Sequence, residues 1–184
     1  MYYSLREMVK YVEFDYEPLT LSDVELEILH KLYVFSNETG YEYGLWYSEA
    51  TGFSDFFTSK NANRIDIPEA AYNEKGICLY HSHTNATHFS DKDYSWLLRD
   101  NVKRIVVITS EKFVLSAEIN DGVIPSFDEY QAFVLPLKSE IDFYMIEMPD
   151  FDAWSEEQRF LESSYEEAFR IARNFKWRLE GGTL

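Results

Sequence analysis

Two short runs of apolar residues constrain the fold of this chain more than any other feature of its sequence. The runs are Ile77-Cys78-Leu79-Tyr80 and Ile105-Val106-Val107-Ile108. Each has the length of a strand, and the absence of alternating polar residues indicates that both faces of that strand are buried. Together with the helices that the rest of the chain predicts, they indicate a mixed α/β fold in which helices flank a mixed sheet.

Three helices are predicted from capping signals and apolar spacing. The first should begin at Ser22, where Ser22 and Glu25 fit a capping box, and continue to about residue 35. A short helix is expected over residues 90–100. The longest, residues 155–179, begins with a second capping box and carries one apolar stripe. That stripe would either pack on the chain's own sheet or form a dimer face, and the glycine pair at 181–182 would end the helix.

Further strands are predicted on either side of the two buried runs. Residues 41–48 and 53–58 should pair across an intervening turn, and residues 112–119 should form a hairpin with the second run. Shorter strands are expected over residues 64–67 and within 133–148, where Pro136 interrupts the pattern. Residues 1–20 would add a short strand or helix.

The charge of the chain restricts its partners. Acidic residues number 33 and basic residues 17, which gives a formal net charge of -16. Such a surface repels phosphate backbones, so nucleic acid is not expected as a partner, whereas a cation or a basic protein is favoured. The chain has one cysteine and shows no signal peptide or membrane span. These features predict a cytoplasmic protein.

A cluster of histidines follows the first apolar run. His81, His83 and His88 lie within eight residues of one another. Residues two apart on a strand point to the same face, so His81 and His83 would present two imidazoles side by side. Asp93, on the first turn of the next helix, would add a carboxylate. Two histidines and one carboxylate, with a fourth position left for water, are typical of a catalytic zinc site.

The same residues also fit a purely structural interpretation. A His-x-His pair on a strand is often a hydrogen-bonded pair, and Ser90-x-x-Asp93 is a common helix N-cap. The two interpretations of Ser90 and Asp93 are compatible, because a cap fixes the helix whose first turn carries the ligand.

His-x-His, a short loop and Ser-x-x-Asp resemble the signature of the JAMM metalloproteases, also called MPN+ or JAB1. The resemblance covers about residues 22–120 and implies a mixed sheet or half-barrel sandwiched by helices. Residues 121–184 would extend the same single domain. It also implies one zinc ion held by His81, His83 and Asp93, with Ser90 helping to hold the carbonyl oxyanion. Two departures lie in the loop: many members have Pro where this chain has Thr84, and the loop is one residue shorter than in many members.

In that family a glutamate near the start of an early strand accepts the proton of the attacking water. The segment Tyr41-Glu42-Tyr43-Gly44-Leu45 is the best match, which assigns this role to Glu42 and leaves Glu38 as the alternative. The Glu-Tyr-Gly element is more similar to that of bacterial JAB-like members. The structural alternative for Glu42 is an exposed carboxylate on an edge strand.

The resemblance implies a zinc-dependent peptidase or isopeptidase that acts on a protein or peptide. The bond that it hydrolyses would be a peptide or isopeptide bond, for example one behind a ubiquitin-like protein. Residues 41–47 would offer a sheet edge to an extended substrate tail. A non-catalytic MPN-type scaffold and another metal-dependent hydrolase, such as a phosphoesterase, remain as alternatives. His88 would support a ligand, contact the substrate or have no catalytic role. His30 and Cys78 are interpreted as structural.

Overall fold

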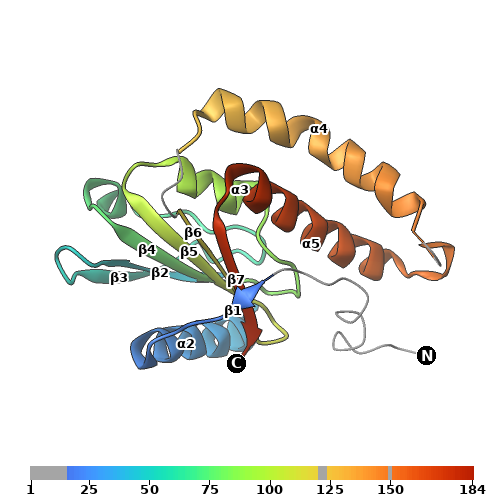
Figure 1. Ribbon diagram of the computed structural model, residues 1–184. Coiled ribbons are helices and arrows are strands. Elements are labelled where there is room, and N and C mark those ends of the chain that lie inside the picture. Colours follow the sequence, from blue (N-terminus) through green and yellow to red (C-terminus); the bar gives the residue numbers. More distant parts are fainter. Residues whose placement is uncertain (1–15, 120–123, 149–150) are drawn as a thin grey trace.

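The computed structural model describes residues 16–119, 124–148 and 151–184, and these residues form a seven-stranded mixed sheet with helices on both faces (Figure 1). The strand order is β1-β7-β6-β5-β4-β2-β3. The β4–β5 and β1–β7 pairs are parallel, and the other neighbours are antiparallel. The predicted mixed α/β class is confirmed.

The elements have the following bounds. The strands are β1 (Glu17–Pro18), β2 (Tyr43–Ser48), β3 (Ser54–Thr58), β4 (Ile77–Ser82), β5 (Val102–Ile108), β6 (Phe113–Glu118) and β7 (Arg178–Thr183). The α-helices are α2 (Asp23–Thr39), α3 (Asp91–Tyr94), α4 (Phe127–Ile146) and α5 (Glu156–Phe175). Short 3₁₀ helices cover Glu69–Asn73, Ser95–Leu98 and Phe151–Ala153.

The strand β4 divides the hydrophobic core into two layers. Ile77 and Leu79 belong to the larger cluster, which also contains buried residues of α4 and α5. Cys78 and Tyr80 belong to a second cluster, which is covered by α2. Since alternate residues of a strand point to opposite faces, His81 continues the row of Ile77 and Leu79 and lies on the side of α3 and α5.

The helix α2 begins at the predicted cap. Ser22 and Glu25 form both hydrogen bonds of a capping box. The helix ends at Gly40, whose positive φ of 71° gives the left-handed conformation that glycine adopts easily. The helix is therefore a few residues longer than predicted. Leu29 and Leu32 are fully buried against the sheet.

The prediction of strands within residues 133–148 is wrong, because this segment belongs to α4 as far as Ile146. Pro136 lies inside the helix, where a proline costs about 3 kcal/mol. Five residues at helical spacing are buried, and burial of each apolar side chain contributes roughly 1.5–3 kcal/mol, so packing outweighs the proline. These residues are Tyr130, Val134, Leu137, Ile141 and Met145. A capping box at Ser126 and Glu129 is the sequence signal that was overlooked.

The helix α5 begins at the predicted capping box of Ser155 and Gln158, but it ends at Phe175 rather than at residue 179. The glycine pair does not end the helix. Gly181 and Gly182 lie in β7, between β6 and β1. The apolar stripe of α5 packs in the chain's own core, where Leu161, Tyr165, Ala168 and Ala172 are buried.

Two smaller predictions also need correction. Residues 64–67 are not a strand, and the segment has no regular secondary structure. The helix expected over residues 90–100 is a single turn, α3, followed by a 3₁₀ helix. Of the element predicted in residues 1–20, residues 17–18 form β1, and residues 1–15 lie outside the described part of the chain.

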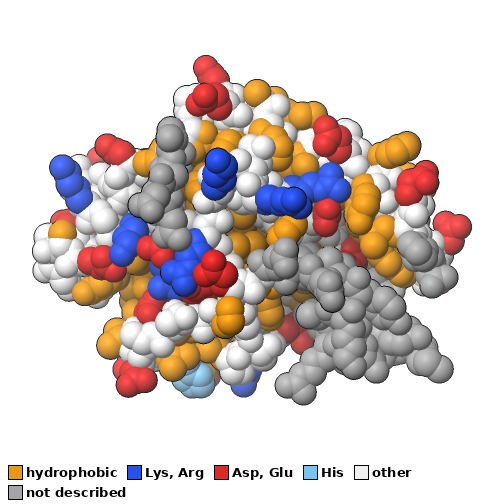
Figure 2. All heavy atoms as spheres, viewed as in Figure 1, with side chains coloured by type: hydrophobic (Ala, Val, Ile, Leu, Met, Phe, Trp, Pro, Cys, Tyr) orange, Lys and Arg blue, Asp and Glu red, His pale blue; other side chains and the backbone are white. Residues whose placement is uncertain are grey.

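Large apolar side chains are exposed along α4. Leu135 is 72% exposed, Phe143 70% and Ile146 62%, whereas Met145 is buried. In Figure 2 hydrophobic side chains are visible at the right of this face, over the ends of α4 and α5. Among the described helices, none combines the length and the hydrophobicity that crossing a membrane needs.

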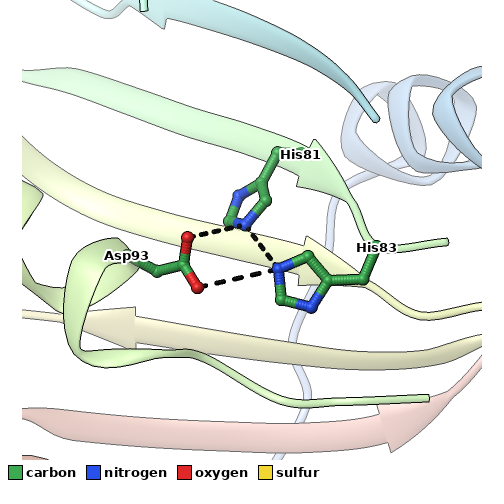
Figure 3. Close-up of side chains that lie close together, drawn as sticks. All are labelled: His81, His83 and Asp93. Atoms are coloured by element: carbon green, nitrogen blue, oxygen red, sulfur yellow. Dashed lines mark hydrogen bonds and ion pairs between the residues drawn. The ribbon is translucent and has the colours of Figure 1, made fainter. Parts of the chain in front are cut away.

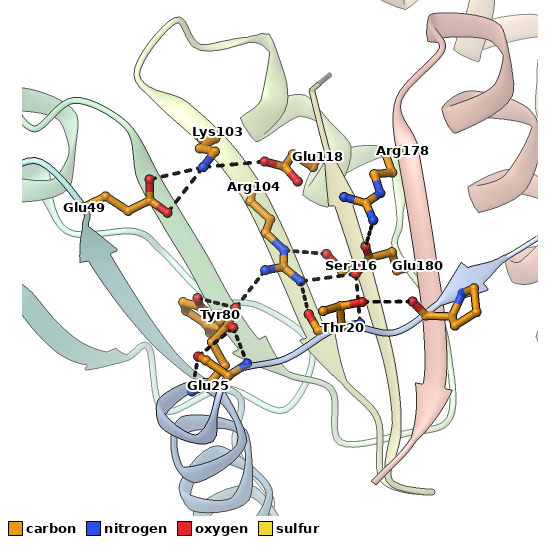
Figure 4. Close-up of polar contacts among 12 residues, drawn as sticks. Thr20, Glu25, Glu49, Tyr80, Lys103, Arg104, Ser116, Glu118, Arg178 and Glu180 are labelled. Carbon is orange, nitrogen blue, oxygen red and sulfur yellow. Dashed lines mark hydrogen bonds and ion pairs between the residues drawn. The ribbon is translucent and has the colours of Figure 1, made fainter. Parts of the chain in front are cut away.

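A half-buried ion network joins α2 to the sheet on the face opposite His81 (Figure 4). Arg104 on β5 donates hydrogen bonds to Glu25 at 2.8 Å and to Ser116 on β6 at 2.7 Å. Its guanidinium also lies 3.5 Å from Glu180 on β7. Glu25 is at the same time the capping residue of α2, so this network connects the start of the helix to three strands.

Arg104→Leu should lower the free energy of unfolding by roughly 3 kcal/mol, because it leaves Glu25 and Glu180 without their shared positive charge. Urea unfolding followed by circular dichroism measures the loss. Arg64→Leu is the matched control, since the Arg64–Asp66 pair is exposed and its loss should change stability by less than about 1 kcal/mol. Equal losses in the two variants would contradict a structural role for the network.

Candidate metal centre

The side chains of His81, His83 and Asp93 converge on one point (Figure 3). The two Nε2 atoms are 3.1 Å apart. Asp93 Oδ1 lies 3.3 Å from His81 Nε2, and Oδ2 lies 3.6 Å from His83 Nε2. Within the described ranges, this is the one group of three or more His, Cys, Asp or Glu side chains whose candidate ligand atoms all lie within 4.8 Å of one another.

The spacing of these atoms fits a metal ion. Tetrahedral bonds of about 2.0–2.1 Å place neighbouring ligand atoms about 3.3 Å apart. The two Nε2 atoms are 3.1 Å apart, and each lies 3.3 or 3.6 Å from a different oxygen of Asp93, so the separations are close to that value for a carboxylate that faces both imidazoles. Two imidazole nitrogens and a carboxylate oxygen also form a donor set that divalent metals accept. The group can therefore bind a metal ion.

Backbone contacts fix His83 on the same side as His81. The His83 N–H donates to the carbonyl of Ile108 at 2.9 Å, which continues the β4–β5 pairing by one residue. The ring nitrogen Nδ1 of His83 lies 2.8 Å from the carbonyl of Thr87 and donates to it. A proton on Nδ1 leaves the lone pair of Nε2 directed at the centre. Sequence reasoning missed this contact, because a backbone acceptor leaves no signal in residue types.

Asp93 is held by the predicted capping box. Its Oδ2 accepts hydrogen bonds from the backbone N–H of Ser90 at 2.7 Å and from the Ser90 hydroxyl at 2.8 Å. The Asp93 N–H in turn donates to the Ser90 hydroxyl oxygen at 3.3 Å. Oδ1 faces His81. The cap therefore orients the carboxylate towards the imidazoles, as the sequence-based interpretation of a combined cap and ligand requires.

Burial and mutual charge set the protonation of this group. Burial lowers the pKa of His81, and Asp93 only partly opposes this effect. Burial also acts to lower the pKa of His83, but the hydrogen bond and charge of Asp93 outweigh it and raise the value. For Asp93, burial acts to raise the pKa, and the two imidazoles outweigh it and hold the pKa well below its usual range. A metal ion would replace the proton that Asp93 favours on His83, so metal uptake should release protons.

Glu42 lies beside these residues because of the strand register. Gly44 pairs with His81 across the antiparallel β2–β4 ladder, so continuation by two residues places Glu42 opposite His83. Opposite residues of antiparallel strands share a face. The Glu42 side chain is 9% exposed, and burial raises its pKa to about 7, with Asp93 adding to the rise and His83 opposing it. The alternative of an exposed edge carboxylate is wrong.

The reserve candidate Glu38 lies elsewhere. It is exposed near the end of α2, and α2 covers the face of the sheet opposite His81. Of the two glutamates considered, the fold brings only Glu42 to the metal-binding group.

The remaining histidines and the cysteine are placed as follows. His88 is buried, stacks on Phe113 with ring centroids 4.9 Å apart, and meets the edge of Tyr165 at 3.8 Å. It packs the loop between the ligands against β6 and α5. His30 is exposed on α2. Cys78 is buried on the other face of β4, where burial raises its pKa to about 11, so it remains a thiol at neutral pH.

Comparisons of the chain with protein-family models, with curated proteins and with solved structures find no match.

His81→Ala and His83→Ala should each abolish stoichiometric metal binding, and Asp93→Asn should weaken it, because each change removes one of three converging donors. Metal content after dialysis, measured by inductively coupled plasma mass spectrometry, gives the answer. His30→Ala is the matched control and should retain the metal. Full metal content in both His81→Ala and His83→Ala would exclude this group as the binding site.

The stability of the metal-free chain should depend on the ionisation of Glu42. The folded pKa of about 7 lies above the ordinary value of 4.5, so between these values the folded state holds a proton that the unfolded state has lost. The contribution of Glu42 to stability is thus present below about pH 4.5 and is lost as the pH rises through 7. Glu42→Gln should reduce the loss of unfolding free energy between pH 5 and 8 by on the order of 1–3 kcal/mol.

Urea unfolding in the presence of a chelator measures this difference. Glu38→Gln is the control, because this exposed carboxylate should leave the pH dependence as it is in the wild type. A Glu42→Gln variant that loses stability as steeply as the wild type would contradict the raised pKa.

Proposed function

We propose that this chain is a zinc-dependent peptidase or isopeptidase of the JAMM type. The observation that carries the proposal is the convergence of His81, His83 and Asp93 on one point, with the buried carboxyl of Glu42 on the same face beside them. Helices on both faces of the mixed sheet agree with the sandwiched half-barrel of that family. The sequence signature and the geometry support the same assignment.

Zinc is the metal that the family resemblance implies, and two imidazoles with one carboxylate form a donor set that zinc accepts. Structural zinc sites take four protein ligands, whereas three ligands from histidine and carboxylate are typical of catalytic sites. One zinc ion held by His81, His83 and Asp93 would act as a Lewis acid and lower the pKa of water to about 7.

Glu42 is the general base and acid of the proposed reaction. Its pKa of about 7 in the metal-free chain allows it to gain or lose a proton near neutral pH. It takes a proton from the attacking water and returns it to the leaving amine. Its backbone is held on both sides, because the N–H donates to Asn61 and the carbonyl accepts from the Thr58 hydroxyl, each at 2.8 Å.

Ser90 has two functions in this proposal. Its backbone N–H and its hydroxyl both hold Asp93 Oδ2. For the hydroxyl to donate to the carbonyl oxyanion, it turns away from Asp93, and the backbone N–H keeps the carboxylate in place. Loss of one such oxyanion donor typically costs about 10²–10³ in rate.

The proposed substrate is a protein or peptide in the cytoplasm, and the link to ubiquitin-like proteins comes from the family resemblance. The net charge of -16 suits a basic face on such a partner. The expectation that residues 41–47 form the free edge needs correction, because β3 pairs with β2 and is the last strand of the described sheet. A substrate tail that adds as a strand would therefore pair with β3.

Glu42→Gln should retain one zinc ion per chain and lose about 10²–10⁴-fold in turnover, because the amide binds no proton. A ubiquitin-like protein fused to a reporter is the substrate, and cleavage should stop with a chelator and return with zinc. Glu38→Gln is the matched control and should cleave at the wild-type rate.

The same measurements separate the alternatives. Two metals per chain would favour a phosphoesterase. No metal, or one metal without hydrolysis of any fusion or peptide, would favour a scaffold. Unchanged cleavage by Glu42→Gln would remove Glu42 from the mechanism.

A further inference from the structure

The pairing of β2 with β4 ends just before two residues of the candidate site. Its last pair is Gly44 with His81, and Glu42 and His83 both lie beyond this pair, outside the regular strands. The ladder therefore brings the Glu42 carboxyl and the His83 imidazole to one face of the sheet, but its backbone hydrogen bonds hold neither residue. The distance between the proposed base and the metal-binding group depends on other contacts.

The hydroxyl of Ser82 takes the place of the next backbone pair. Ser82 lies between the two candidate histidine ligands and is 1% exposed. Its Oγ accepts a hydrogen bond from the Tyr43 N–H at 3.0 Å and donates to the Tyr43 carbonyl at 3.4 Å. One side chain thus bonds both backbone groups of the residue that follows Glu42, as a partner strand would.

A second hydroxyl holds Glu42 itself. Thr58, at the end of β3, donates through Oγ1 to the Glu42 carbonyl at 2.8 Å. The same oxygen accepts from the Lys60 N–H at 3.1 Å, and Lys60 has a φ of 51°, in the left-handed region. The chain turns at this point, and the Glu42 N–H donates to the Asn61 carbonyl at 2.8 Å. Both backbone groups of Glu42 are therefore bonded to residues 58–61.

A third hydroxyl joins the same loop to the segment that carries the ligands. Thr84 directly follows His83, and its Oγ1 donates to the Ala62 carbonyl at 2.7 Å. Ala62 in turn directly follows Asn61, which accepts the hydrogen bond of Glu42. The loop after β3 is thus bonded to Glu42 at one residue and to the neighbour of His83 at the next.

We infer that Thr58, Ser82 and Thr84 are positioning residues for Glu42. Their hydroxyls set where the Glu42 carboxyl lies relative to His83, at the point where strand pairing no longer does so. All three side chains are at least partly buried, so water competes less for these hydrogen bonds. Since a displacement of about 1 Å can cost about 10²-fold in rate, loss of one hydroxyl should lower turnover without removing the metal.

This inference rests on the proposed function, and a threonine at the other end of the β2–β3 hairpin supplies a matched control. Thr58→Val keeps the shape of the side chain and removes the hydroxyl, whereas Thr58→Ser keeps the hydroxyl. Thr51 lies in the turn between β2 and β3. Its hydroxyl likewise donates one hydrogen bond, to Glu74, and accepts one, from the Phe53 N–H.

The kinetic test uses the full chain with zinc supplied and a ubiquitin-like fusion as substrate. Thr58→Val should lower kcat about 10–100-fold, with KM and zinc content unchanged. Thr58→Ser should stay within about threefold of the wild-type kcat, and Thr51→Val should match the wild type. Equal kcat in Thr58→Val and Thr51→Val would overturn the inference and leave the peptidase assignment standing.

A double-mutant cycle separates positioning from a general loss of structure. In the Glu42→Gln background, Thr58→Val should reduce the residual rate by less than about twofold, because the carboxyl that it positions is gone. A loss as large as in the wild-type background would contradict the inference. Thr84→Val breaks the other connection of the loop and should give the same pattern, which keeps the test available if Thr58→Val does not fold.

Hydrogen exchange tests the inference without activity. Measured by NMR in the full chain with zinc supplied, exchange of the Glu42 N–H should be at least about tenfold faster in Thr58→Val than in wild type, because the turn that carries its acceptor is released. Thr58→Ser and Thr51→Val should exchange at the wild-type rate. If wild type cleaves no fusion or peptide and exchange is faster only in Thr58→Val, the proposed function fails and the positioning of Glu42 is supported. If exchange in Thr58→Val equals that in wild type, the inference is refuted whether or not substrate is cleaved.

Discussion

The pairing of β4 with both of its neighbours determines where every residue of the candidate site lies. β5 holds β4 in parallel register, and the His83 N–H extends that register past the end of the strand. β2 holds β4 from the other side, with Gly44 opposite His81, and this brings Glu42 opposite His83. If β4 shifted by one residue relative to its two neighbours, its imidazoles would face α2 and would no longer lie beside Glu42.

The charges of the metal-binding group make its burial unfavourable in the metal-free chain, and they make the group well suited to bind a metal ion. Two imidazoles and two carboxyls, from Glu42 and Asp93, lie together in a largely buried region. Without an ion, the arrangement depends on shared protons and on the two hydrogen bonds from Ser90 to Asp93. A divalent cation at the common point would satisfy the negative charges directly. Local conflict with the ordinary rules of burial is a frequent property of functional sites.

Gly44 allows close packing beside the candidate metal ligands. It pairs with His81 on β4 and with Phe57 on β3. A Cβ at Gly44 would lie 2.4 Å from the Phe57 ring and 2.9 Å from Ile65 Cδ1, so the missing side chain lets both residues lie close to the sheet beside His81.

Patterns between neighbouring residues were predictable from the sequence, and contacts between distant segments were not. The sequence by itself determined the two central strands, the capping boxes at Ser22, Ser90 and Ser155, and the grouping of His81 with His83, because strand alternation and capping act within a few residues. It did not predict α4, because Pro136 masked a helical spacing that only packing stabilises. Only the tertiary structure decided between Glu42 and Glu38 and placed Gly181 in β7, because these depend on which strands pair and on which face each helix covers.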